Sequence, residues 1–387
     1  MALLGDDQAA DLRREILRRA VLSSVDSFPQ KDDPEKRVFR EAKLSTVVFT
    51  LMKSESAVAR SEPFTIRVHP ENTVREDSPC LSLTAADIPQ YDPANFTVVS
   101  CSQADWDVAI RIVGSGRMQR LKDFAEFFQG EVNETNERAK GNLVHADEGG
   151  KLVTRGASIC LYVTRPASQG EDLYLNVKRF LAGKGEDTKA FHHRHRRIGL
   201  QESSPQNNFR RIIAAMIPAD EFCNHTVNYA PEPNCTVPLA LVLALLDSRL
   251  AEWYFRLGST NAHVSHYQLY NLPCPAFAER AAAEDRRALD RARAAIAQGD
   301  ADAAFAALQP GLAHPPFSLA VRDVMVDLVN RIIAIEEARG EIARAARSAL
   351  APAAQPFQDF IDRLLYAMAG LAEGEIRGLQ DRLAHML

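Results

Sequence analysis

The fold is organised around an apolar run, Val237-Pro-Leu-Ala-Leu-Val-Leu-Ala-Leu-Leu246, and the polar stretch that follows it. The run is about half as long as the ~20 apolar residues that a membrane span requires. Two charged residues, Asp247 and Arg249, come directly after it. We therefore expect a helix that is buried inside a folded domain.

The polar stretch is Arg256-Leu-Gly-Ser-Thr-Asn-Ala-His-Val-Ser-His-Tyr-Gln-Leu-Tyr-Asn-Leu-Pro-Cys-Pro275. Its middle is rich in Ser, Thr, Asn, His and Gln, whose side chains carry hydrogen-bond donors and acceptors. Its end contains Pro273 and Pro275, which fix φ and remove two backbone donors. The stretch predicts a surface loop that presents polar groups and ends sharply.

Length and composition are those of an ordinary globular protein. The chain has 387 residues, 46% of them hydrophobic, which allows two or three domains. The net charge of −5 argues against a basic coat over the whole surface but allows local basic patches. The six cysteines form no Cys-x-x-Cys pair, and the N-terminal residues do not read as a secretion signal. We expect a cytoplasmic protein without a membrane partner.

The N-terminal part combines helical and strand patterns. Apolar side chains recur with helical spacing from Leu12 to Leu22, and the apolar, β-branched segment Leu44–Leu51 predicts a buried strand. The alternating segment Phe64–His69 predicts a half-buried strand. Residues 1–115 are thus expected to be an α/β remnant, the C-terminal strands of a larger α/β domain.

Helical patterns follow at Trp106–Ile112 and Leu121–Phe128, with Gly114-Ser-Gly116 between them. A phosphate-binding loop requires a preceding strand and a longer glycine spacing, so we interpret these glycines as a turn between helices.

Residues 116–276 contain many short strand patterns and a basic block. The block includes Phe191-His-His-Arg-His-Arg-Arg197, and Arg210 and Arg211 follow it. We expect a small α+β domain here. Residues 277–387 are rich in Ala, Arg and Glu, with a heptad seam from Val321 to Ile335. They predict a helical hairpin or bundle.

Metal binding and nucleophilic catalysis are both disfavoured by the residue patterns. The histidines of the basic block lack zinc-site spacing and have cationic neighbours, and the same spacing argument applies to Cys223, His225 and Cys235. No Gly-x-Ser-x-Gly elbow is present, and no cysteine has activating neighbours. We therefore predict no metal site and no catalytic residue in this chain.

Nucleic-acid binding requires cations for phosphates and Asn, Gln, Arg, Ser or Thr side chains for base edges. The region Gln129–Gln268 supplies both, most clearly in Asn207-Asn-Phe-Arg-Arg211 and Ser259-Thr-Asn261. The alternative is that these residues cap helices and form turns.

The order of four segments resembles the C-terminal part of adenine-specific DNA methyltransferases of the type IIG restriction-modification class, with a TaqI-like target-recognition domain. The segments similar to the end of the methyltransferase domain are Phe28-Pro-Gln30 and Val38–Leu51. The segment similar to the start of the recognition domain is Gln129–Thr135. The later part of the recognition domain is similar to Asn208–Pro218 and Leu243–Pro275, and the helical tail is similar to Ile361–Ile376.

The resemblance implies a catalytic domain that binds S-adenosylmethionine and holds a flipped adenine with an Asn-Pro-Pro-Tyr motif. This sequence departs from that pattern, because its only similar segment is His314-Pro-Pro-Phe317, in the helical part. We therefore expect a truncated or split protein whose catalytic residues and cofactor belong to another part or chain. No cofactor is expected in this chain, and its status as an enzyme is open.

The resulting hypothesis is the sequence-specific recognition portion of an N6-adenine DNA methyltransferase, with double-stranded DNA and possibly a separate methyltransferase or nuclease chain as partners. The alternative is a helical interaction protein with no DNA role. The residues expected to contact bases or phosphates are Gln129, Asn133, Arg155, Arg196, Arg197, Asn208, Arg210, Ser259, Asn261 and His263.

Overall fold

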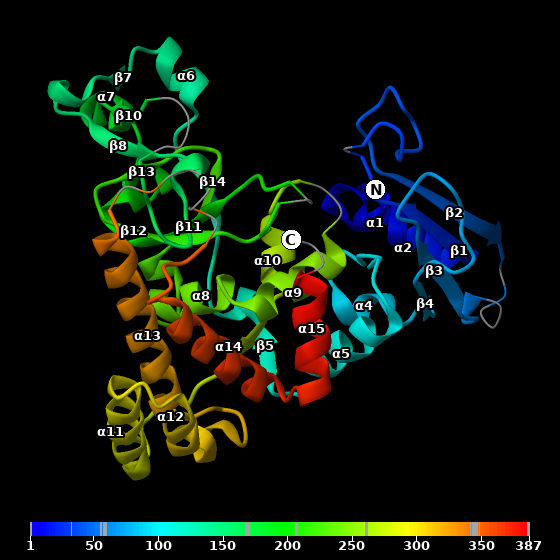
Figure 1. The fold of residues 1–387 in the computed structure, drawn as a ribbon. Coiled ribbons are helices and arrows are strands. Elements are labelled where there is room, and N and C mark those ends of the chain that lie inside the picture. The colour runs from blue at the N-terminus through cyan, green and yellow to red at the C-terminus, as the bar shows by residue number, and fades with distance from the viewer. Residues whose placement is uncertain are drawn as a thin grey trace. The chain divides into compact units, whose positions relative to one another are not determined.

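The computed structural model describes residues 2–31, 33–54, 56, 60–166, 171–205, 208–259, 262–340, 342, 347 and 349–384. The chain divides into two compact units (Figure 1). Unit 1 contains Met1–Gly116 and Trp253–Ala262, and unit 2 contains Arg117–Glu252 and His263–Leu387. Unit 2 contains residues from both of the later expected domains, 116–276 and 277–387. The two units therefore do not test the boundary between these domains, and the three-domain division stays a prediction.

Unit 1 is built on a four-stranded sheet with the strand order β2-β1-β3-β4. Strand β1 pairs antiparallel with β2 and parallel with β3, and β3 pairs antiparallel with β4. The main elements are α1 (Ala2–Gly5), α2 (Ala10–Arg19), β1 (Ala20–Phe28), β2 (Thr46–Lys53), β3 (Phe64–Val68), β4 (Cys80–Leu83), α4 (Ile88–Tyr91) and α5 (Gln103–Gly114).

The core of unit 1 lies under the two central strands. Val25 of β1 and Ile66 of β3 are fully buried, and β3 alternates as its sequence predicts. Helix α5 begins at the capping residue Ser102, whose hydroxyl accepts from the backbone N–H of Asp105. The carboxylate of Asp105 in turn accepts from the indole N–H of Trp253, at 2.8 Å, which fastens the returning segment to this unit.

Strand β2 differs from its prediction, because it is exposed rather than buried. Five of its eight residues are exposed and the other three are half-buried. The physical reason is position: β2 lies at the edge of the sheet, with β1 as its one neighbour among the described strands. An apolar, β-branched sequence predicts a strand but does not reveal whether another strand lies beside it.

Unit 2 begins with small sheets. The largest has the order β6-β14-β11-β12-β9, a second has β13-β8-β10-β7, and β15 pairs with β5. Its strands are β5 (Met118–Arg120), β6 (Phe128–Gln129), β7 (Leu143–Val144), β8 (Lys151–Thr154), β9 (Tyr162–Val163), β10 (Leu173–Leu175), β11 (Arg197–Gln201), β12 (Ala214–Ile217), β13 (Phe222–Cys223), β14 (Val227–Pro231) and β15 (Pro273–Pro275).

The central strands of the largest sheet, β11 and β14, are almost completely buried. They pair antiparallel from Arg197↔Pro231 to Gln201↔Val227. Strands buried on both faces lose the alternating pattern of a half-exposed sheet, which is why this region reads as short apolar pieces in the sequence. The helix expected at Leu121–Phe128 is absent from these described residues, which form a 3₁₀ turn, Leu121–Asp123, and the start of β6.

Helices complete unit 2. They are α6 (Glu134–Ala139), α7 (Val177–Leu181), α8 (Leu239–Leu246), α9 (Arg249–Gly258), which continues into unit 1, α10 (His266–Tyr270), α11 (Ala283–Ala297), α12 (Ala301–Leu308), α13 (Leu319–Ala338), α14 (Gln355–Ala369) and α15 (Glu373–Ala384). All eight residues of α8 are buried, as the apolar run predicts.

The heptad seam lies on α13 and is buried inside unit 2. Val321, Met325 and Ile332 are fully buried, and α13 packs against α8, α11 and α14. The seam therefore serves the fold of this chain and is not available to a partner helix.

The polar stretch forms less loop than its composition predicts. Its first residues complete α9, its middle includes α10, and its end is the buried strand β15. The two prolines are compatible with a strand because β15 belongs to a two-stranded sheet and therefore has an edge.

The predicted fold class is confirmed: mixed α/β sheets are followed by a helical C-terminal region (Figure 1). None of the helices in the described residues is both long and apolar enough to span a membrane.

Candidate nucleic-acid interface

Strand β6 forms one edge of the five-stranded sheet of unit 2 and carries an exposed polar side chain. Gln129 is exposed at this edge and pairs with Asn228 of β14. The Lys189 ammonium group donates to the backbone carbonyl of Gln129, at 2.9 Å. We name Gln129, Lys189 and Arg196 the β6 edge cluster.

Arg196 is the member of this cluster farthest from β6, because it precedes β11, which pairs with β14 on the side away from β6. It is exposed and pairs with Glu232 at 2.7 Å, and the Glu232 N–H donates to its carbonyl. The partners of Gln129 and Arg196 on the β14 side, Asn228 and Glu232, are four residues apart. At about 3.3 Å per strand residue this is roughly 13 Å along the strands, and β11 lies two strands from β6, which adds roughly 10 Å across the sheet.

Aromatic packing holds the cluster in place. The His192 ring lies 4.8 Å from the Phe128 ring and hydrogen-bonds to the Tyr229 hydroxyl at 3.1 Å. Burial lowers the pKa of His192, although the Glu131 carboxylate opposes this shift. His193 is buried and stacks on Phe222. Both histidines therefore support the sheet, while the exposed residues at the end of the basic block are Arg194, His195 and Arg196.

Arg197 requires a correction to the sequence-based expectation. Its side chain is 0% exposed, and its guanidinium group donates to the Glu131 carboxylate at 2.9 Å and to the Glu221 carbonyl. It also lies over the Tyr229 ring. A group enclosed in this way has no access to a phosphate, so we leave Arg197 out of the proposed DNA contacts.

Asn133 and Arg155 have local structural roles, although both retain accessible surface. Asn133 caps α6, since its side chain accepts from the Asn136 N–H at 3.1 Å. Arg155 is half-buried and donates to the Glu171 carbonyl. These contacts agree with the alternative stated above, that such residues cap helices and form turns. Of the two residues, Asn133 is the one that follows β6 closely in the sequence.

Asn208 and Arg210 lie in the segment that leads to β12. The Asn208 amide donates to the Arg210 carbonyl at 3.0 Å, which closes a turn. The Arg210 guanidinium group donates to the carbonyls of Ile212 and Ser248, at 3.2 and 3.1 Å. Both residues are half-buried and stabilise their own segment.

Three expected residues belong to the polar stretch. His263 is exposed, and its ring pairs with the Glu202 carboxylate at 2.7 Å in unit 2. Ser259 is half-buried in unit 1, and Asn261 lies outside the described residues. Of the ten expected residues, the structure therefore places Gln129 at the β6 edge and Arg196 at the start of β11, two strands away in the same sheet, and Asn133 follows β6 closely in the chain.

Lys189 is the member of the cluster that sequence reasoning missed. It was one of many cations in the basic region, and its pattern did not distinguish it from its neighbours. The available signal was its position just before the apolar Ala190-Phe191 pair, which anchors the turn in the core of the small sheet.

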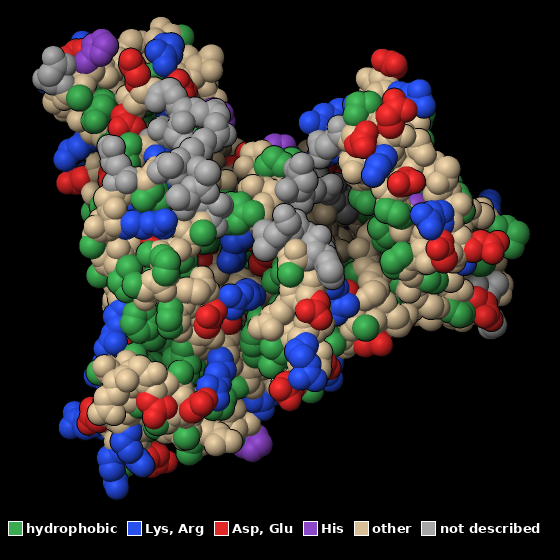
Figure 2. Space-filling model, in the orientation of Figure 1, with side chains coloured by type: hydrophobic (Ala, Val, Ile, Leu, Met, Phe, Trp, Pro, Cys, Tyr) green, Lys and Arg blue, Asp and Glu red, His purple; other side chains and the backbone are tan. Residues whose placement is uncertain are grey.

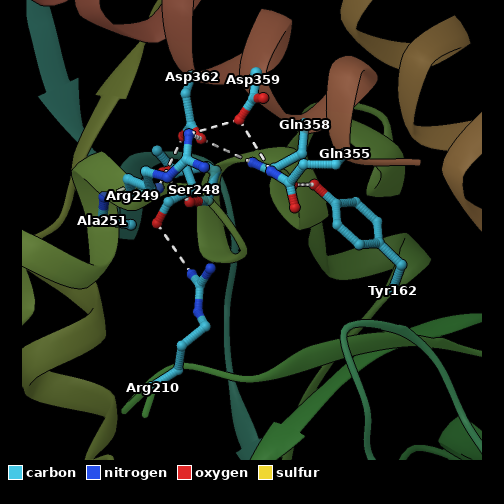
Figure 3. Close-up of polar contacts among 10 residues, drawn as sticks. Tyr162, Arg210, Ser248, Arg249, Ala251, Gln355, Gln358, Asp359 and Asp362 are labelled. Carbon is cyan, nitrogen blue, oxygen red and sulfur yellow. Dashed lines mark hydrogen bonds and ion pairs between the residues drawn. The ribbon is translucent and has the colours of Figure 1, made fainter. Parts of the chain in front are cut away.

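A separate feature of unit 2 is a cavity of about 990 Å³ beside α14 and α15. Figure 3 shows the polar network at its wall. Arg249 pairs with Asp359 and Asp362, at 2.8 and 3.0 Å, and Gln358 donates to Asp362 at 3.3 Å. Burial raises the pKa of Asp362. These groups satisfy one another and join α9 to α14, so we assign the network a structural role.

Charges of both signs lie interspersed on the face of the molecule shown in Figure 2. This arrangement agrees with the net charge of −5. DNA contact on such a surface depends on the placement of a few cations rather than on a broad basic field.

The two segments that most resemble methyltransferase motifs do not fit S-adenosylmethionine or a flipped adenine. In His314-Pro-Pro-Phe317, the Phe317 ring is fully buried against Phe277 and Arg117 and so cannot stack on a base. Gly116 forms a left-handed turn after α5 rather than the start of a cofactor loop. In the part of the chain that the structure describes, no three potential ligands gather as a metal site.

No protein-family model and no curated protein sequence match the chain. Among solved structures, the chain is similar to the Type IIL restriction-modification enzyme MmeI in complex with DNA, with a TM-score of 0.46 and 12% identity. The similarity covers 100% of this chain and 48% of that one, so this chain spans about half of that enzyme's length. A similarity of this size does not establish a shared function.

Proposed function

We propose that this chain is the sequence-specific DNA-recognition portion of an N6-adenine DNA methyltransferase of a restriction-modification system. The single observation that supports it best is the β6 edge cluster, in which the exposed Gln129 amide and Lys189 ammonium group lie at the β6 edge and the exposed Arg196 lies at the start of β11 in the same sheet. The sequence resemblance supplies the restriction-modification context.

The chemistry of the cluster suits duplex DNA. The Gln129 amide provides a donor and an acceptor, which is the pair that reads an adenine edge in the major groove. Lys189 and Arg196 provide positive charge for phosphates. Because β6 is hydrogen-bonded to β14, the amide is presented on a rigid element, which favours discrimination between bases.

The ion pair of Arg196 does not oppose this role. Its two side chains are 58% and 48% exposed, and exposed pairs of this kind contribute only about 0–1 kcal/mol. A phosphate can therefore replace the Glu232 carboxylate at small cost. The Arg197–Glu131 pair differs, since its burial would make the same exchange costly.

The phosphate contacts are tested by replacing both cations, Lys189→Ala with Arg196→Ala. We expect all DNA sequences to be bound more weakly and the slope of log K against log salt to fall by about 0.9 for each phosphate that is no longer neutralised. Fluorescence anisotropy at several salt concentrations measures both. The matched control is Arg293→Ala, because Arg293 is 46% exposed and pairs with Asp327 on a remote helix.

Equal salt slopes for the double variant, the control and the unmodified chain would remove Lys189 and Arg196 from the interface. Weaker binding of one DNA sequence alone would instead indicate base reading by these cations.

Base reading is tested by Gln129→Ala. The Gln129 amide now donates to the His225 carbonyl at 3.0 Å and is otherwise exposed, so its removal leaves the sheet intact. We expect a cost of about 1–3 kcal/mol at one base pair of the preferred site and none at the others. A uniform loss of affinity across all sites would contradict base reading.

The methylation chemistry belongs, in this proposal, to a part outside this chain. Isothermal titration of S-adenosylmethionine into this chain alone is expected to give no binding heat. Saturable binding would contradict the proposed division of labour and would favour an autonomous methyltransferase.

A further inference from the structure

The cavity beside α14 and α15 has no part in the proposed DNA contacts. Among the described residues that line it, none belongs to the β6 edge cluster, and all belong to unit 2. Its volume of about 990 Å³ falls within the range of roughly 300–1,000 Å³ that is common for small-molecule sites. The groups on its walls indicate which kind of molecule it can hold.

One face of each of two helices contributes to the walls. The residues from α14 are Asp359, Asp362, Arg363, Tyr366 and Ala367, and those from α15 are Glu373, Ile376, Gln380, Leu383 and Ala384. Most of these steps are of three or four residues, which places the side chains on one helix face. Ile376 and Leu383 are half-buried, as are Phe305 of α12 and Leu371 at the same cavity. A hydrocarbon body can therefore lie against α15.

Tyr366 is a buried donor at the cavity. The residue is 4% exposed, and its hydroxyl has no hydrogen-bond partner among the described residues. The Gln380 side chain lies near the hydroxyl but beyond hydrogen-bond distance. Burial raises the pKa of Tyr366, so the hydroxyl stays protonated and can donate. Because a buried tyrosine hydroxyl usually has a partner, an acceptor atom of a ligand is expected here.

Arg363 supplies positive charge three residues before Tyr366, on the same face of α14. Its guanidinium group lies over the Phe305 ring and pairs with Asp302 at 2.7 Å. The two side chains of this pair are 42% and 88% exposed, and such exposed pairs contribute little to stability. A ligand anion can therefore replace the Asp302 carboxylate at small cost.

The described carboxylates at the cavity already have partners. They are Glu252, Asp359, Asp362 and Glu373. Two of them pair with Arg249, one accepts from two backbone N–H groups, and one pairs with Arg377 on α15. The groups that remain for a ligand are thus donors, which favours an anion over a cation.

We propose that this cavity binds an apolar carboxylic acid. One carboxylate oxygen accepts from the Tyr366 hydroxyl, the other pairs with the Arg363 guanidinium group, and the hydrocarbon body lies against Ile376 and Leu383. A purely apolar molecule would leave the Tyr366 hydroxyl without a partner, and a strongly polar one would place polar groups against the apolar wall. The proposal is independent of DNA recognition.

The first experiment titrates octanoate into the full chain and follows binding by ligand-observed NMR. The comparison probe is 1-octanol, which has the same hydrocarbon body without the charge. We expect one saturable site for octanoate and about tenfold weaker binding of 1-octanol, because charge-assisted hydrogen bonds are the stronger ones. Equal affinity for the two probes, or no saturable binding of octanoate, would overturn the proposal.

The second experiment is Tyr366→Phe, which removes the hydroxyl and keeps the ring. We expect octanoate to bind about tenfold more weakly, while the unfolding midpoint stays the same because the hydroxyl has no partner in the protein. Tyr270→Phe is the matched control: its hydroxyl accepts from the Phe127 N–H, and it is not at the cavity, so octanoate affinity should not change.

Unchanged octanoate affinity in a folded Tyr366→Phe variant would overturn the proposal. A lower unfolding midpoint with unchanged affinity would do the same, because the hydroxyl would then serve the fold.

The third experiment is Arg363→Met, with Arg293→Met as its control, since Arg293 has similar exposure and pairs with Asp327 outside the cavity. We expect Arg363→Met to weaken octanoate about tenfold and to leave 1-octanol unchanged, because only the anion pairs with the guanidinium group. Equal weakening of both probes, or weakening by the control variant as well, would contradict the pairing with Arg363.

Discussion

At the scale of single residues, Arg196 and Arg197 are adjacent but have opposite environments. Arg196 is exposed and pairs with Glu232, whereas the Arg197 side chain is 0% exposed and pairs with Glu131. The Cys223 N–H also donates to the Glu131 carboxylate, at 3.0 Å, so the buried pair joins three strands or turns of unit 2. Its role is structural.

We predict that Arg197→Met destabilises the chain by about 3–5 kcal/mol, because it leaves the Glu131 carboxylate buried without its cation. The double variant Arg197→Met with Glu131→Leu should be less destabilised than the single variant, since no charge remains unpaired. Urea unfolding measures both. A cost below about 0.5 kcal/mol for the single variant would show that the pair is open to solvent.

A second buried acid, Asp247, predicts a pH dependence of stability. Its carboxylate accepts from the N–H groups of Tyr162 and Ala214, both at 3.0 Å, and burial raises its pKa from 3.8 to about 7. Between these values the native state holds a proton that the unfolded state has released. This group's contribution to the unfolding free energy therefore decreases as pH rises from about 4 to about 7 and stays constant above.

The variant Asp247→Asn should lack this component, so its unfolding free energy changes less between about pH 5 and about pH 8 than that of the unmodified chain. Asp302→Asn is the control, because Asp302 is 88% exposed. The same pH dependence in both variants would contradict the assignment to Asp247.

At the scale of elements, β6 depends on a close approach between backbones. A Cβ atom at Gly130 would lie 1.9 Å from the Asn224 carbonyl oxygen and 2.4 Å from its carbon. The Gly130 N–H donates to the Val227 carbonyl at 2.8 Å, directly after Gln129. Glycine is thus required for β6 to lie against β14 and present the cluster.

We predict that Gly130→Ala destabilises the chain by about 1–3 kcal/mol and weakens DNA binding beyond that effect, because β6 must move. Gly374→Ala is the matched control: nothing lies within 4 Å of its added Cβ, so stability should stay equal or rise. Thermal unfolding and anisotropy test the pair. An unchanged Gly130→Ala variant would contradict the role assigned to β6.

The sequence predicts which helices and strands form better than it predicts which elements lie next to each other. The apolar run predicts the buried helix α8 because all of its faces are apolar, and β3 is readable from its alternation. The exposure of β2 is unreadable, because it depends on which strand lies beside it. Likewise, a shift of one residue in a strand reverses inside and outside, so the sequence could not separate Arg196 from Arg197.

At the scale of the whole molecule, the two units differ in their exposed side chains. The β6 edge cluster of unit 2 combines two cations with an exposed amide, whereas strand β2 of unit 1 exposes apolar side chains. With a net charge of −5, the chain lacks a general attraction for DNA, so binding must come from a few placed contacts. A preference for one sequence is therefore the property to measure.

The most direct test is selection of bound duplexes from a random DNA library by this chain alone, at low and at physiological salt. We predict enrichment of one short sequence motif, with recovery that falls as salt rises because phosphate contacts release counterions. Recovery without any enriched motif, or no recovery at either salt concentration, would contradict sequence-specific DNA recognition.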